Sequence, residues 1–215
     1  MSNKIHIKPY TGALGAEILG IDLSKKLSKN HFNLITNTLN EYHVVFFRKQ
    51  DINPSQLVKF GQNFGALEEH PLIPTLKDFP EIIELKSADD GPGPYARNSR
   101  IWHSDMTYET CPPKLTMLYC LEAPDLGGET AFANQHLAFT ELSEGLKTTL
   151  AEISALHTAE DLAALYGADP QTAPRAEHPV IRSHDQTGNE ALYVCGAFTR
   201  RFANWTRSES GPLLK

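Results

Sequence analysis

Short apolar stretches, each ended by glycine, proline or a polar turn, recur along this chain of 215 residues. Residues 44–48 (VVFFR) are apolar on both faces and predict a buried strand. The sequence Gln186-Thr187-Gly188-Asn189 separates two more apolar stretches and predicts a hairpin turn. The sequence contains neither repeated strand–helix–strand units nor a G-x-G-x-x-G loop, which argues against a doubly wound sheet. We therefore expect a mainly β chain, a sandwich or open barrel, with flanking helices.

Helices are predicted where apolar residues recur at helical spacing. Residues 31–42 show this pattern, and Asn53-Pro54-Ser55-Gln56 is typical of a helix start, because Asn53 can cap and Pro54 fits the first helical position. The helix that begins there is expected to end at Gly65. Further helices are expected within 138–154 and after Thr158. Further strands are expected at residues 4–8, 16–21, 81–86, 115–121, 130–133, 179–183 and 191–195, and the strand at 115–121 is expected to be buried.

One long segment has no pattern typical of a core. Residues 87–99 (SADDGPGPYARNS) combine glycine, proline, aspartate and asparagine, and they predict a loop. Because long loops in compact domains often bind ligands, we expect a lid at the mouth of a pocket that orders when substrate binds.

Composition excludes several classes of protein. Lys and Arg number 20 against 26 Asp and Glu, so a net charge of −6 argues against a nucleic-acid binder. No apolar run is long enough to span a membrane. The cysteines are few and odd in number, three in all, which argues against a disulfide framework and favours a cytoplasmic location. No C-x-x-C pair is present, which argues against a zinc knuckle.

The most informative residues are Trp102-His103-Ser104-Asp105-Met106. In a strand, side chains at positions i and i+2 share a face, so His103 and Asp105 would present an imidazole and a carboxylate side by side. With one more histidine, these groups make the facial triad that leaves positions open on Fe(II). The alternative is a surface His–Asp pair, because H-x-D often occurs by chance.

The wider sequence around this pair resembles a known family. WHSDMTYETCPPKLTMLY followed by APDLGGETAFAN is similar to the taurine dioxygenase and aryloxyacetate dioxygenase family, and so are GAEILGIDLS, VVFFRKQ, FGALEEHP and HPVIRSHDQTGNEALYV. The resemblance implies a double-stranded β-helix, or jelly roll, with Fe(II) as metal and 2-oxoglutarate as cosubstrate. It further implies O2-dependent hydroxylation of a small and often anionic substrate, of sulfonate or carboxylate type.

The resemblance also implies roles for individual residues. His103 and Asp105 match the first two iron ligands, and Thr130 matches a threonine that donates a hydrogen bond to 2-oxoglutarate. His70 and Phe198 match residues that contact the substrate. The alternatives are a strand threonine at 130, a surface histidine at 70 and a core phenylalanine at 198. Ile73 and Ser99 differ from the taurine enzyme, which argues against taurine itself.

Two groups of the family pattern have no match in the sequence. In the family, the distal histidine ligand and the arginine that binds 2-oxoglutarate lie downstream of the segment that FTRR matches. By position, neither Arg200 nor Arg201 of FTRR matches that arginine. We therefore expect residues 1–215 to be a single dioxygenase domain, incomplete at its C-terminus and lacking the last strands of the jelly roll. The candidate substitute ligands are His157, His178 and His184.

Two other functions remain as alternatives. A catalytically inactive jelly-roll module would explain the missing histidine, but it leaves the retention of His103, Asp105 and Thr130 unexplained. A zinc hydrolase would need a base such as the glutamate of H-E-x-x-H, which the sequence lacks. The expected partners are a small-molecule substrate and O2, with neither nucleic acid nor membrane, and a homo-oligomer is left open.

Overall fold

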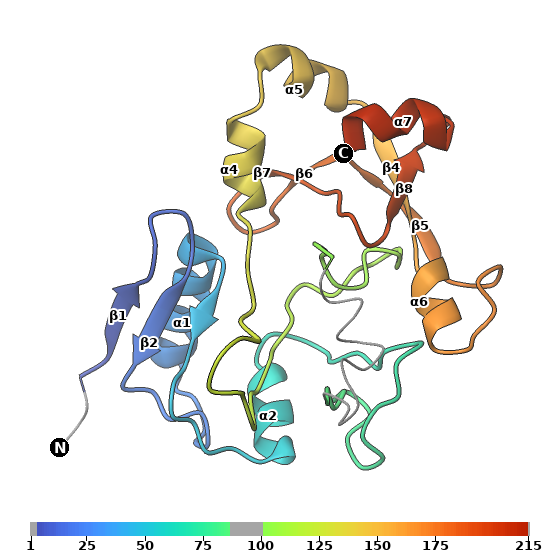
Figure 1. Cartoon of the computed structure of the whole chain (residues 1–215). Helices are drawn as coiled ribbons and strands as arrows, with labels where there is room; N and C mark the ends of the chain where they lie inside the picture. Colours follow the sequence, from blue (N-terminus) through green and yellow to red (C-terminus); the bar gives the residue numbers. More distant parts are fainter. Residues whose placement is uncertain (1–3, 87–100, 215) are drawn as a thin grey trace.

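The N-terminal part of the protein is a three-stranded sheet with a helix packed on it (Figure 1). The computed structural model describes residues 4–86 and 101–214. β1 (His6–Pro9) pairs antiparallel with β2 (Ala16–Leu19), which pairs parallel with β3 (Val45–Phe46). Helix α1 (Lys29–Tyr42) contacts β2 and β3. The strands expected at 4–8, 16–21 and 44–48 are found with other bounds, and residues 44–47 are half-buried rather than buried.

Local capping chemistry explains where the first two helices begin. The Ser28 hydroxyl accepts from the backbone N–H of His31 at the start of α1. Asn53 precedes α2 (Pro54–Gly61): its side chain accepts from Gln56 N–H at 3.0 Å, and the Gln56 side chain accepts from Asn53 N–H at 2.8 Å. This reciprocal pair is a capping box and confirms the predicted helix start. The helix ends at Gly61, earlier than the expected Gly65.

The C-terminal part contains a second three-stranded sheet and a hairpin. β4 (Ser154–Thr158) pairs antiparallel with both β5 (Arg175–Pro179) and β8 (Thr199–Phe202). β6 (Ile181–Ser183) and β7 (Glu190–Leu192) form the predicted hairpin. Its turn contains Gly188 at φ 72°, a left-handed conformation that glycine adopts without strain. The remaining helices are α4 (Gln135–Thr140), α5 (Glu144–Leu150), α6 (Glu160–Leu165) and α7 (Arg207–Leu214).

Three hydrophobic clusters hold these parts together. Ile18, Ile35 and Phe60 pack between the first sheet, α1 and α2. Val180 and Phe202 centre a second cluster at the C-terminal sheet. The third cluster packs α6 against residues from two distant segments, and its members are Tyr108, Ala159, Leu162, Ala163, Ala173, Ala197 and Phe198. This third cluster brings residues 106–108 next to residues 195–198.

Three predicted strands have no ladder. Residues 81–86, 115–121 and 130–133 are not paired with any strand in the described part of the chain. Within 115–121, side chains still alternate as in a strand: Met117 and Tyr119 pack on the N-terminal core, whereas Leu118 is 63% exposed. The buried strand expected at 115–121 is therefore wrong, because no described segment covers Leu118 or offers 115–121 a ladder of hydrogen bonds.

The observed fold class is several small β-sheets with flanking helices. A continuous jelly roll is not formed by residues 4–86 and 101–214, since their strands fall into two three-stranded sheets and one hairpin. No helix in these ranges is long and apolar enough to cross a membrane. The loop expected at 87–99 lies outside the described residues.

The capping box at α2 gives a first prediction. Asn53→Ala removes the acceptor for Gln56 N–H and should lower the free energy of unfolding by about 1 kcal/mol, within the usual range of about 0.5–2 kcal/mol for a helix cap. Urea denaturation followed by circular dichroism measures the loss. Asn37→Ala, at an exposed position inside α1, is the control and should not destabilise the protein. Equal stability of Asn53→Ala and the unmutated protein would contradict the capping assignment.

Candidate metal centre

His103 and Asp105 lie side by side. Their closest atoms, His103 Nε2 and Asp105 Oδ1, are 3.4 Å apart. The backbone conformation that brings them together differs from the expected strand, because residues 105–108 form a turn. Met106 in this turn has φ 51°, a strained conformation for a residue with a side chain. The structure thus brings the pair together through a turn, and its role as metal ligand stays a prediction.

Hydrogen bonds leave one atom of each side chain free to bind a metal. His103 Nδ1 donates to the Ile101 carbonyl oxygen at 2.8 Å, which leaves the Nε2 lone pair as the available ligand when the ring is neutral. The Thr116 hydroxyl donates to Asp105 Oδ2 at 2.8 Å, which leaves Oδ1 facing His103. Two ligand atoms 3.4 Å apart can both lie about 2 Å from one ion. The donor set therefore fits two ligands of a facial triad.

The two side chains also share a proton in the metal-free protein. The hydrogen bond to Asp105 raises the pKa of His103 to about 9, against the opposing effect of burial. The same hydrogen bond, with help from Thr116, lowers the pKa of Asp105. At neutral pH the pair is therefore an imidazolium and a carboxylate, and a metal ion must displace the proton to bind.

Aromatic side chains form one wall beside the pair. The Phe198 ring lies 6.3 Å from the His103 ring in edge-to-face geometry, and the Tyr108 ring lies 5.0 Å from Phe198. The Tyr108 hydroxyl is 3.0 Å from His70 Nε2. The structure thus connects His70 and Phe198 to His103, although Phe198 is also a buried core residue. The sequence analysis did not identify Tyr108 or Thr116 as site residues. For Tyr108, the available signal was an aromatic residue three positions after Asp105.

Thr130 lies in a segment without a ladder. It is exposed, and no neighbouring strand in the described part of the chain positions the backbone of 130–133. Its role toward 2-oxoglutarate stays a prediction.

None of the three substitute histidines completes the centre. His157 Nδ1 lies 2.9 Å from the Thr107 hydroxyl in the core, where burial lowers the pKa of His157 to about 4. His178 Nε2 donates to the Glu109 carbonyl oxygen, and His184 accepts from Thr187 in the β6–β7 turn. Within the described ranges, no group of three His, Cys, Asp or Glu side chains could hold a metal ion.

Arg200 and Arg201 are occupied elsewhere, as the sequence comparison of these positions suggested. Arg200 bridges β8 to α6 through Glu160, with Nε and Oε1 3.0 Å apart, and also pairs with Asp161. Arg201 donates to the backbone oxygens of Phe202 and Trp205. The guanidinium groups of both arginines bond to α6 or to the turn after β8, so neither is placed to bind a cosubstrate.

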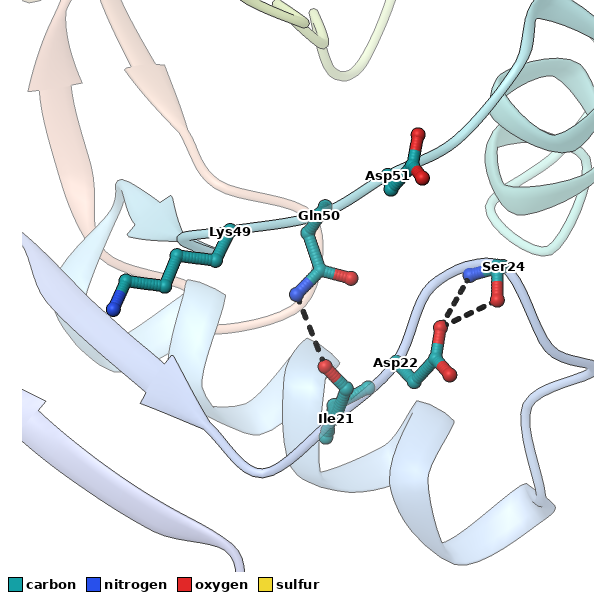
Figure 2. Close-up of a pocket in the computed structure, with 6 residues that line it drawn as sticks. All are labelled: Ile21, Asp22, Ser24, Lys49, Gln50 and Asp51. Carbon is teal, nitrogen blue, oxygen red and sulfur yellow. Dashed lines mark hydrogen bonds between the residues drawn. The ribbon is translucent and has the colours of Figure 1, made fainter.

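A separate cavity of about 370 Å³ lies beside the N-terminal sheet. Figure 2 shows that two of its polar side chains are hydrogen-bonded: Gln50 donates to the Ile21 oxygen and Asp22 accepts from Ser24. It includes no residue of the candidate metal centre. The cavity therefore does not mark the site.

Comparison with known proteins identifies the family. A profile of the family described as taurine catabolism dioxygenase TauD, TfdA family matches residues 6–215. The chain belongs to this family. An alkylsulfatase of Acinetobacter baylyi is 31% identical over 227 residues, which cover 99% of this chain and 69% of that protein. An alpha-ketoglutarate-dependent sulfate ester dioxygenase of Pseudomonas putida is 31% identical over 98% of this chain and 72% of its own length.

Solved structures agree. The crystal structure of a taurine dioxygenase from Burkholderia xenovorans superimposes with a TM-score of 0.77 at 29% identity, covering 98% of this chain and 70% of that one. By family, this protein is a 2-oxoglutarate-dependent dioxygenase, a class that uses Fe(II). The predicted resemblance is confirmed.

The shared proton gives a second prediction, for metal-free protein. Because the pKa of His103 is raised from 6.5 to about 9, the folded state binds this proton more tightly than the unfolded state. Its stabilising contribution should be fully present below pH 6.5 and be lost as the pH rises to about 9. Thermal denaturation in a chelating buffer at a series of pH values measures how steeply stability falls with pH.

His103→Gln should flatten the slope between pH 6.5 and 9, because it removes the titrating group. His6→Gln, at the start of β1, is the control and should retain it. An unchanged slope in His103→Gln would mean that another group carries the pH dependence.

Proposed function

We propose that this protein hydroxylates a small anionic organic compound, of sulfonate, sulfate ester or carboxylate type. The reaction consumes 2-oxoglutarate and O2, and Fe(II) is held in part by His103 and Asp105. The single observation that carries the proposal is the oriented pair: Nε2 and Oδ1 lie 3.4 Å apart with their other polar atoms already bonded. The names of the two relatives, an alkylsulfatase and a sulfate ester dioxygenase, support the anionic substrate class.

Each residue of the centre has a defined task in this proposal. Bound Fe(II) supplies the redox chemistry with O2. His103 releases its proton when the metal binds, while the Ile101 carbonyl keeps Nδ1 protonated and the ring in place. Thr116 holds the Asp105 carboxylate at the angle that points Oδ1 toward His103. Phe198 closes one side with an apolar surface that excludes water.

We further propose that residues 1–215 form one domain of a jelly roll that is completed by additional strands, and that these supply the third iron ligand and the arginine for 2-oxoglutarate. Two observations support this. The described residues offer no third ligand beside the pair. Leu118 and Leu121 are apolar and are 63% and 79% exposed among the described residues. The three free thiols support the proposed cytoplasmic location.

The deciding experiment is substrate-coupled turnover, which is the third prediction. The protein, expressed with any downstream in-frame sequence of its gene, is incubated with Fe(II), ascorbate, 2-oxoglutarate and an alkyl sulfonate, alkyl sulfate or aryloxyacetate. We expect succinate to form in step with oxidised substrate. His103→Ala should lose Fe(II) affinity and turnover together, because one of two protein ligands on this chain is gone.

His31→Ala, on α1, is the matched control and should keep both activities. Fe(II) affinity that survives in His103→Ala would overturn the metal assignment. Tight metal binding without any succinate would instead favour an inactive module of the same family.

The fourth prediction concerns Thr130. If its hydroxyl donates to a carboxylate of 2-oxoglutarate, Thr130→Val should weaken 2-oxoglutarate binding by about 1.5–3 kcal/mol, the value of a hydrogen bond to a charged group. Anaerobic titration of the Fe(II)-loaded protein measures the affinity. Thr149→Val, an exposed threonine of α5, is the control. Unchanged affinity in Thr130→Val would refute the role.

A further inference from the structure

Both ring nitrogens of His70 are occupied by the protein. Nδ1 accepts from the backbone N–H groups of Leu72 at 3.1 Å and Ile73 at 3.0 Å. A nitrogen that accepts two hydrogen bonds carries no hydrogen of its own, so the neutral ring has its hydrogen on Nε2. The two backbone bonds therefore fix the tautomer of His70.

The Nε2 hydrogen has one partner, Tyr108. His70 Nε2 donates to the Tyr108 hydroxyl oxygen at 3.0 Å. Tyr108 cannot easily move away, because it is 1% exposed and packs edge-to-face against Phe198 in the cluster beneath α6. In this arrangement His70 has no ring hydrogen left for a substrate.

The ring is also uncharged. Burial lowers the pKa of His70, against a smaller opposing effect of the Asp105 carboxylate. Protonation of Nδ1 would break the hydrogen bonds from Leu72 and Ile73. His70 is close enough to the metal pair to feel the charge of Asp105, yet it contributes no positive charge there.

We propose that Tyr108 determines the substrate specificity of this site by occupying the one ring hydrogen that His70 could offer to an anionic substrate. Tyr108 acts through His70 and is therefore a positioning residue. The consequence is a site that binds its substrate's anionic group without help from His70. This inference rests on the proposed function, because it places the substrate beside His103 and Asp105.

The geometry predicts a gain of binding when the hydroxyl is removed, which is the fifth prediction. Tyr108→Phe keeps the ring in the core and frees the His70 Nε2 hydrogen for a sulfonate or sulfate oxygen. Affinity for hexanesulfonate should rise about tenfold, the lower end for a hydrogen bond to a charged group. Adding His70→Ala to Tyr108→Phe should abolish the gain. Tyr166→Phe, in a tyrosine that packs on the same cluster, is the matched control and should change nothing.

The state of His70 is measured independently of activity. In metal-free protein with 15N-labelled histidine, long-range 1H–15N spectra at pH 7 should show His70 as the neutral Nε2–H tautomer, with a protected Nε2 hydrogen. Tyr108→Phe should shift that signal and speed its exchange with water, whereas Tyr166→Phe should not. An Nδ1–H tautomer or an imidazolium at pH 7 would overturn the inference.

Hexanesulfonate affinity is measured by calorimetry on anaerobic protein loaded with Fe(II) and 2-oxoglutarate. Equal affinity in Tyr108→Phe and the unmutated protein would overturn the inference, as would a gain that persists without His70. Absence of turnover on every substrate, with the expected spectra and the expected gain, would overturn the proposed function and leave this inference standing.

Discussion

The burial of Thr107 and Tyr108 fixes the turn that presents the metal pair. Both residues are 1% exposed, and both bond to a histidine from a distant part of the chain: Thr107 to His157 and Tyr108 to His70. Buried polar groups must keep their partners, since leaving one unpaired costs about 1–3 kcal/mol. The strained turn at Met106 persists because the residues after it are anchored in the core. His103 and Asp105 then emerge on the outer side of this anchored turn.

This anchoring explains which parts of the site could be predicted from sequence. The juxtaposition of His103 and Asp105 was predicted from their spacing, although a turn and not a strand produces it. The α2 capping box and the β6–β7 hairpin, though not the bounds of its strands, were predicted because their chemistry lies within a few neighbouring residues. The bond between His70 and Tyr108 spans 38 positions and depends on tertiary packing, which local patterns do not encode. The hydrogen bond from Thr116 to Asp105 likewise depends on where the tertiary fold places residues 115–121.

The segment 115–121 shows the same limit for strands. The sequence predicts a buried strand here, and Met117 and Tyr119 do face the core. A ladder, however, is a property of two segments, and the partner cannot be inferred from one of them. Leu118 and Leu121 therefore stay exposed where the sequence predicted a buried strand. An exposed apolar patch is typical of a surface that another element covers. The strand expected at 130–133, which contains Thr130, has no ladder for the same reason.

The electrostatics of the centre connect folding and metal binding through one proton. Without metal, the proton on His103 Nε2 satisfies Asp105 Oδ1, so two potential ligands do not repel or remain unpaired. A divalent ion bound between the same two atoms replaces that proton with a stronger positive charge, so binding releases the proton and tightens as the pH rises toward 9. The hydrogen bonds from His103 Nδ1 to Ile101 and from Thr116 to Asp105 Oδ2 lie on the far side of each group and can persist through this exchange. The protein therefore needs no rearrangement of these two side chains to pass from the metal-free to the metal-bound state, because the proton already holds the place of the metal.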